Sequence, residues 1–318
     1  MVPRLGKLVS NINPQHLLKQ VADSRFAKAK PLNKGAQAIE KLDVMVRQAP
    51  QQAHEAYLLN VDGTVLTGGK LMDGMKPVLE TIKLLRRPVR FITGSSTVSR
   101  QQIADELRRN GVEVELEQIF TPTRVTIAYL KKNYPGAKVY PIANAEVCAA
   151  LEAGGIELST NPLDTRVVLV AHDRDFTYAK LKDAYDAILS NGAVLISSSV
   201  RREHLLPDGS YEPGTLSIIA AIEKATRTNL TKNLGSPETD MLEMIYSGLS
   251  ANPAKSLLVT DSLAGDVRMA KSFGVPTALI LTGESTYEQA RSLRSKDQPN
   301  YVLDSVVDIV PPYIVNQL

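Results

Sequence analysis

The sequence predicts an α/β protein whose core is a doubly wound parallel sheet, with a second α/β unit inserted into it. Apolar runs of strand length alternate with segments of helical period from about residue 55 onward, and the same alternation resumes toward the C-terminus. The connections are short and the strands are rich in apolar β-formers, which indicates that helices cover both faces of the sheet.

The first half of the predicted core follows this alternation closely. Its elements are, in order, a strand over residues 56–61, a helix over 75–86, a strand over 89–92, a helix over 97–110 and a helix over 125–132. Gly111 supports the end of the second helix, because glycine commonly follows the last helical residue.

The later elements fall into two groups. Strands over 167–170 and 194–196 and helices over 178–189 and 216–226 precede a helix over 237–246, a strand over 256–260, a helix over 263–272 and a strand over 277–281. The last four resemble the first half in pattern, so the group before them is interpreted as an insertion. The predicted limits are a basic extension over 1–50, a core over 51–135 and 230–318, and a cap domain over 136–229.

Composition indicates an ordinary globular protein. A chain of 318 residues, 43% of them hydrophobic and 22% charged, is long enough for about two domains of roughly 150 residues each. The single cysteine, Cys148, cannot form an internal disulfide, and the four histidines show no metal-ligand spacing with it. No apolar run has the roughly 18 residues of a membrane span, so we expect no such span.

The N-terminal segment is basic. Residues 1–50 hold nine Lys/Arg and three Asp/Glu, a net charge of +6. The remainder of the chain holds 28 Lys/Arg and 31 Asp/Glu, a net charge of −3. An acid-poor basic segment is typical of mitochondrial targeting, with a solvated arm of a cytoplasmic protein as the alternative. Binding of nucleic acid by this arm is disfavoured, because no aromatic residues interleave with the basic ones.

Polar residues follow several predicted strands, where ligands of such sheets bind. They are Asn60, Asp62 and Thr64 after the first strand, Thr93, Gly94, Ser95 and Ser96 after the second, Ser236 before a late helix, and Thr260, Asp261 and Asp266 after a late strand. Carboxylates from separated segments are suitable ligands for Mg²⁺, and hydroxyls and amides before a helix suit a phosphate. The structural alternative is that these residues only form turns and helix caps.

Several long motifs resemble the haloacid dehalogenase (HAD) superfamily. In chain order they are "NVDGTVLTGG", "FITGSSTVSR", "DFTYAKLKDAYDAI", "PGTLSIIAAIEKATR", "GSPETDMLEMI" and "LLVTDSLAGDVRMAKSFGVPTALILTG". The resemblance is to the branch with a large α/β cap, which includes para-nitrophenyl-phosphate, phosphoglycolate and pyridoxal-phosphate phosphatases. It covers about residues 57–312 and implies a HAD core with an inserted cap and Mg²⁺-dependent phosphoryl transfer.

The resemblance implies a role for each residue after the first two strands. The family's nucleophilic aspartate falls on Asn60, and its general acid/base, which also contributes to the metal site, falls on Asp62. The hydroxyl that holds the transferring phosphate matches Thr93. The two asparagines that usually follow this hydroxyl are replaced by Gly94 and Ser95, so phosphate binding at Thr93 and Gly94 is an expectation.

The later motifs depart from the family in the same way. The motif lysine falls on Ser236, and the two metal-binding acids fall on Asp261 and Asp266, with Thr260 where the family has glycine. Lys232 lies four residues before Ser236 and is the nearest lysine in the sequence, although its register does not match.

The loss of both the nucleophile and the lysine predicts a site without catalysis. An amide oxygen is neutral, so Asn60 cannot attack phosphorus as a carboxylate does. The family site has four acids and one lysine, and this site has three acids, so the net charge of −3 is the same in both. The sequence therefore predicts a pseudophosphatase, with Mg²⁺ binding by Asp62, Asp261 and Asp266 left open.

The expected role is that of a structural or interaction subunit. It would act as a homodimer through the cap or as part of a larger, mitochondrial assembly, and a small phosphorylated ligand is a further expected partner. The alternative is a Mg²⁺-dependent phosphatase of small phosphorylated metabolites.

Overall fold

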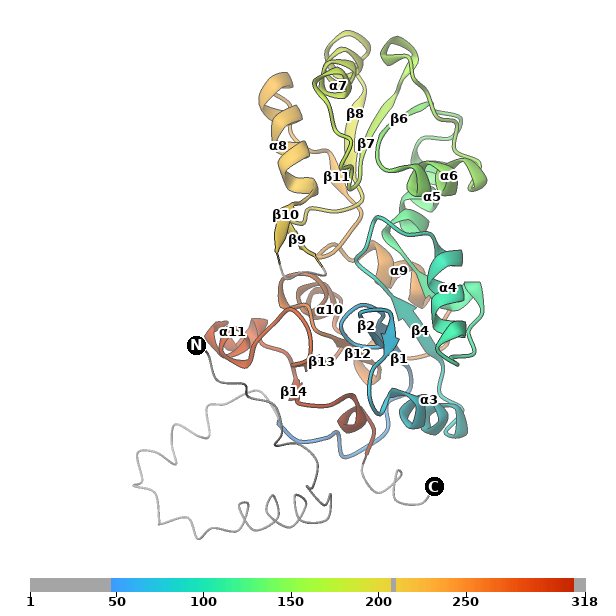
Figure 1. The fold of residues 1–318 in the computed structure, drawn as a ribbon, viewed down its shortest axis with the longest axis vertical. Coiled ribbons are helices and arrows are strands. Elements are labelled where there is room, and N and C mark those ends of the chain that lie inside the picture. The colour runs from blue at the N-terminus through green and yellow to red at the C-terminus, as the bar shows by residue number, and fades with distance from the viewer. Residues whose placement is uncertain (1–46, 207–209, 312–318) are drawn as a thin grey trace, which may run out of the picture. The chain divides into compact units, whose positions relative to one another are not determined.

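The computed structural model describes residues 47–206 and 210–311, which contain two parallel sheets with helices on both faces (Figure 1). The larger sheet has the strand order β14-β13-β12-β1-β4-β5. Its strands are β1 (Tyr57–Asn60), β4 (Val89–Ile92), β5 (Ile119–Phe120), β12 (Leu257–Thr260), β13 (Thr277–Ile280) and β14 (Tyr301–Leu303). Most of the basic segment predicted over residues 1–50 lies outside the described residues.

The smaller sheet has the strand order β11-β8-β7-β6, and all its neighbours are parallel. Its strands are β6 (Val139–Ile142), β7 (Val167–Val170), β8 (Val194–Ser197) and β11 (Lys232–Asn233). The core was expected to resume at residue 230, but β11 still pairs with β8, so the chain returns to the larger sheet after Asn233. Two hairpins add β2 (Leu66–Thr67) with β3 (Lys70–Leu71) and β9 (Glu203–Leu205) with β10 (Tyr211–Pro213).

Side-chain hydrogen bonds cap five of the helices at their N-termini. The helices are α3 (Met75–Leu84), α4 (Arg100–Arg109), α5 (Pro122–Asn133), α6 (Ala145–Ala153), α7 (Tyr178–Asn191), α8 (Thr215–Thr226), α9 (Asp240–Ser247), α10 (Arg268–Phe273) and α11 (Tyr287–Ser292). Ser99 and Gln102 form a reciprocal capping box at α4, so this helix begins three residues later than the predicted residue 97. Within the described ranges, none of these helices has the length and apolarity needed to cross a membrane.

Apolar clusters fill both faces of both sheets. Tyr57 and Leu59 of β1 pack with α3 and α4, whereas Leu58 between them points to the opposite face, as the two-residue period of a strand requires. The cluster that contains Leu58 also contains Val167 and Leu169 of β7, so one continuous apolar cluster joins the two sheets. The other face of the smaller sheet packs against α7 and α8.

The predicted and observed bounds are identical for two strands of four residues. The strands at 89–92 and 167–170 have the predicted bounds. The helix predicted over 263–272 is a π-helical turn, Leu263–Val267, followed by α10, and Asp266 lies in that turn. The sequence analysis missed ten elements: β2, β3, β5, β6, β9, β10, β11, β14, α6 and α11.

Candidate functional site

The candidate site lies at the carboxyl ends of three neighbouring strands of the larger sheet. Strand β1 pairs with β12 on one side and with β4 on the other, so their ends meet at one edge. Asn60 is the last residue of β1, Thr93 follows β4, and Asp261 follows β12. Asn60, Thr93 and Asp261 are all buried.

The centre of the site is the carboxylate of Asp266, which is almost completely buried. Its Oδ2 accepts hydrogen bonds from Asn60 Nδ2 at 2.8 Å and from Thr260 Oγ1 at 2.9 Å. Its Oδ1 accepts a hydrogen bond from Ser236 Oγ at 2.9 Å. Burial raises the pKa of Asp266, and the hydrogen bonds from Thr260 and Ser236 oppose this shift. Both carboxylate oxygens are thus satisfied by neutral donors.

The orientation of the Asn60 amide is fixed by its neighbours. Its Nδ2 donates to the Asp266 carboxylate and, at 3.1 Å, to Thr260 Oγ1. Its Oδ1 accepts the backbone N–H of Asp62 at 3.2 Å. A carboxylate cannot donate a hydrogen bond and a backbone N–H cannot accept one. Only this orientation of the Asn60 amide therefore satisfies both the Asp266 carboxylate and the Asp62 N–H. The amide therefore presents hydrogens, not lone pairs, to Asp266.

Asp62 and Thr93 bond to each other. Thr93 Oγ1 donates to Asp62 Oδ2 at 2.7 Å and accepts the backbone N–H of Ser95 at 2.9 Å. The hydroxyl expected to hold a phosphate is therefore already engaged on both sides. Gly94 lies beside it and lines the adjoining cleft.

Asp261 lies in a narrow slot between two glycine-containing loops. Its Oδ2 accepts the backbone N–H of Glu284 at 2.9 Å. A Cβ on Gly63 or on Gly283 would overlap the Asp261 carboxyl group, and Gly63 also has a positive φ of 73°. Burial raises the pKa of Asp261 to about 6.

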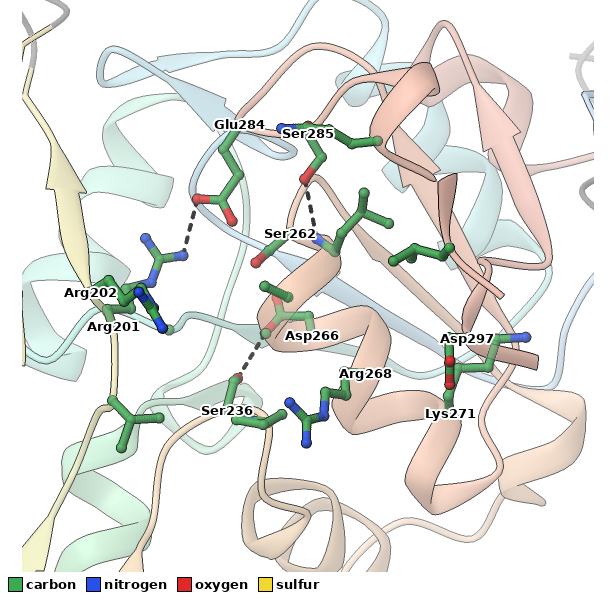
Figure 2. A pocket seen from close by; sticks show the side chains of 18 of the residues that line it. Arg201, Arg202, Ser236, Ser262, Asp266, Arg268, Lys271, Glu284, Ser285 and Asp297 are labelled. Carbon is green, nitrogen blue, oxygen red and sulfur yellow. Dashed lines mark hydrogen bonds and ion pairs between the residues drawn. The ribbon is translucent and has the colours of Figure 1, made fainter. Parts of the chain in front are cut away.

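A cleft of about 1190 Å³ adjoins the site and is lined by the segment around Ser198–Glu203 and by α10 and the loops near it (Figure 2). Arg201 extends toward Glu284, and their side chains form an ion pair with Nη2 and Oε2 3.2 Å apart. The sequence analysis missed Arg201, Glu284 and Arg268, because exposed charged residues are common in any loop and carry no motif here.

Lys232 does not take the place of the motif lysine. Its Nζ pairs with Asp240 Oδ2 at 2.8 Å, at the start of α9. Lys232 lies only four residues before Ser236 in the sequence, but the carboxylate of Asp240 holds its ammonium group.

The fold and the site together define an α/β protein with a phosphatase-like core and an inserted smaller sheet. A sequence profile described as haloacid dehalogenase-like hydrolase matches residues 57–157, and one described as HAD-hydrolase-like matches residues 233–309. The chain is 26% identical to the sugar-phosphatase AraL of Bacillus subtilis (strain 168) over 252 residues, which cover 79% of this chain and 90% of AraL. It is 28% identical to chronophin of Homo sapiens over 272 residues, which cover 80% of this chain and 92% of chronophin.

Solved structures agree with these similarities. The 4-nitrophenylphosphatase of Thermotoga maritima superposes with a TM-score of 0.74 at 25% identity, over 80% of this chain and 96% of that protein. The chain belongs to the haloacid dehalogenase-like hydrolases, in their branch of capped phosphatases.

The family generally uses Mg²⁺, but the residues present here do not fit that ion. Mg²⁺ needs oxygen lone pairs in octahedral geometry, whereas Asn60 directs N–H groups at Asp266, and the three donors occupy both oxygens of that carboxylate. In residues 47–206 and 210–311, no three His, Cys, Asp or Glu side chains form a group that could hold a metal. The predicted ligands Asp62, Asp261 and Asp266 instead have separate hydrogen-bond partners.

Replacing Asn60 by aspartate tests the contact with Asp266. In Asn60→Asp, a carboxylate oxygen replaces the amide donor 2.8 Å from Asp266 Oδ2. We expect the free energy of unfolding at pH 7 to fall by roughly 2–4 kcal/mol, because a charge-assisted hydrogen bond becomes a buried like-charge contact. Urea unfolding measures this change.

The loss should shrink at lower pH. The repulsion raises the folded-state pKa of the pair above its unfolded value of about 4, so the folded variant binds more protons and gains stability as pH falls toward that value. Asn252→Asp, the same change at an exposed turn, is the control and should alter stability by less than about 0.5 kcal/mol. Unchanged stability of Asn60→Asp at pH 7 would show that the amide does not support Asp266.

Proposed function

We propose that this chain is a catalytically inactive phosphatase homologue that serves as a structural or interaction subunit. One observation carries the proposal: the three side chains that bond to Asp266 are three of those that depart from the family pattern. Asn60 stands at the nucleophile position, Ser236 at the lysine position and Thr260 at the glycine position. Residues from three separate motifs thus form one hydrogen-bond network around a single acid.

The chemistry of these replacements supports inactivity. Phosphoryl transfer to the protein needs an anionic oxygen, and the amide of Asn60 is neutral and hydrogen-bonded on both sides. The reaction also needs positive charge near the transferred group, and Ser236 supplies none. Asp62 is the nearest other acid in the sequence motif, but its carboxylate is held by the Thr93 hydroxyl.

An interaction role is supported by the surface of α7. Tyr178, Tyr185 and Leu189 are exposed, Tyr178 by 83%, and their spacing of seven and four residues places them on one face of the helix. An exposed apolar stripe of this kind favours contact with another protein surface. We propose that the contact is with a second copy, and that the acid-poor basic N-terminal segment directs the protein to a mitochondrial assembly.

The alternative is an active Mg²⁺-dependent phosphatase of small phosphorylated metabolites. The names of the relatives, which include a sugar-phosphatase and a glycerol-3-phosphate phosphatase, favour it. This function requires a nucleophile other than residue 60 and a site that accepts Mg²⁺. The hydrogen-bonded side chains of Asn60 and Asp266 provide neither of these.

Turnover of para-nitrophenyl phosphate distinguishes the two functions. We expect no turnover above background by the unmodified protein with or without Mg²⁺, because both the nucleophilic carboxylate at residue 60 and the lysine at residue 236 are absent. The double variant Asn60→Asp, Ser236→Lys restores both groups and should gain Mg²⁺-dependent activity. Metal-dependent turnover by the unmodified protein that Asp62→Ala abolishes would establish the alternative.

The native mass of the full-length protein tests the interaction role. We expect a particle of at least two 34.7 kDa chains, because the apolar stripe of α7 would be covered in an assembly. Tyr178→Glu should reduce the mass by placing a charge in the contact, whereas Lys224→Glu on the neighbouring helix α8 serves as a control. A monomer in the unmodified protein would refute self-association through this face.

A further inference from the structure

The hairpin of β9 and β10 depends on side chains for its position. Each strand has three residues, and within residues 47–206 and 210–311 the two strands pair only with each other. A two-stranded hairpin is marginally stable on its own in water, so contacts with the rest of the chain must hold it. The backbone N–H groups of Gly214 and Leu216 donate to the carbonyl oxygens of Arg202 and Arg201, which fixes its base at the start of α8 (Figure 1).

The carboxylate of Glu212 holds the hairpin against the segment between β7 and α7. Glu212 lies in β10, directly opposite His204 of β9. Arg174 donates to its carboxylate from Nε at 2.9 Å and from Nη2 at 2.7 Å, and His172 Nε2 lies 3.1 Å from its Oε1. Both His172 and Arg174 belong to the segment between β7 and α7, so one side chain of the hairpin is bound by two groups of that segment.

Two imidazole rings meet where the hairpin contacts this segment. The ring centroids of His172 and His204 are 4.2 Å apart, and His172 is 7% exposed. His172 Nδ1 and His204 Nε2 are buried and have no hydrogen-bond partner within the described part of the chain. A neutral imidazole can place its lone pair at such a nitrogen, whereas an imidazolium would place there an N–H without an acceptor. The docked hairpin therefore favours neutral rings.

The charges around His204 also disfavour a proton on its ring. The groups that face it are His172 after β7, Arg174 before α7, Arg201 before β9 and Glu212 in β10. Burial lowers the pKa of His204 to about 4; His172 and the two arginines lower it further, and Glu212 opposes them. The nearby carboxylate of Asp173 is occupied by Lys180, with Nζ and Oδ2 2.6 Å apart. Glu212, which Arg174 already binds, is thus the acid left to offset a charge on His204.

We propose that the docking of the β9–β10 hairpin is pH-dependent: the hairpin stays docked while His204 is neutral, and it separates from the segment between β7 and α7 when His204 is protonated. Its base at Gly214 and Leu216 remains fixed, so the movement is a local opening of one small element. Glu203 and Tyr211 of the hairpin line the cleft beside Asp266, and its release would therefore widen that cleft.

The direction of the pH dependence follows from the two states of His204. Its ring has a pKa of about 4 in the docked hairpin and the ordinary value of 6.5 when released. The docked state thus binds fewer protons and loses stability as the pH falls from about 6.5 toward 4. With these two values, the equilibrium constant for docking is about twentyfold smaller at pH 5 than at pH 7.

A single tryptophan on the hairpin tests this proposal. The chain contains no tryptophan, and Tyr211 of β10 is 63% exposed, so Tyr211→Trp introduces one fluorescent probe at a tolerant position. Fluorescence anisotropy of the full-length variant is measured from pH 8 to pH 4.5 at constant ionic strength, with far-UV circular dichroism on the same samples. We expect the anisotropy to fall below about pH 6.5 as the hairpin is released, while the circular dichroism stays unchanged.

Two further substitutions in the Tyr211→Trp protein assign the effect. His204→Gln removes the titrating ring and should abolish the fall in anisotropy. His54→Gln is the matched control, because His54 is also a half-buried histidine with a pKa lowered to about 4 but lies beside Tyr57 of β1, and it should leave the fall unchanged.

Three results would overturn the proposal. They are a constant anisotropy over this pH range, a fall that persists in His204→Gln, and an ordinary pKa of about 6.5 for His204 in an imidazole proton NMR titration of the unmodified protein.

Discussion

The buried carboxylate of Asp266 is the constraint on which the rest of the site depends. A charged group removed from water is costly unless hydrogen bonds replace its solvation. Here three neutral donors surround it, from the end of β1, from the end of β12 and from the segment that follows β11. Because Asn60 and Asp266 are separated by 206 residues, satisfying this one acid also holds distant parts of the chain together.

The same network connects the two sheets. Ser236 follows Gly235, and a Cβ at Gly235 would overlap the backbone oxygen of Ser198, so the chain passes very close to the end of β8 as it leaves the smaller sheet. Glu284 binds Asp261 through its backbone N–H and Arg201 through its carboxylate. In this chain, polar contacts between protein groups hold the positions that the resemblance to the family assigns to the metal-binding acids and the motif lysine.

The sequence predicted the order of the site residues but not their contacts. The strand at 167–170 is an unbroken run of four buried apolar residues, whereas β5 and β11 have two residues each, too few for a period to appear. Motif order located Asn60, Ser236 and Asp266, but nothing in a linear pattern indicates that Asn60 and Ser236 both donate hydrogen bonds to Asp266. Lys232 illustrates the limit, because its sequence position suggested the site and its actual partner is Asp240.

Titration of the unmodified protein with Mg²⁺ in a calorimeter tests the central claim most directly, because a carboxylate satisfied by protein donors has no need of a cation. The account predicts no saturable binding at millimolar Mg²⁺, and the same trace for Asp261→Ala. Saturable binding of one ion per chain that Asp261→Ala abolishes would show that the site has kept its metal, and would contradict the view that hydrogen bonds have taken its place.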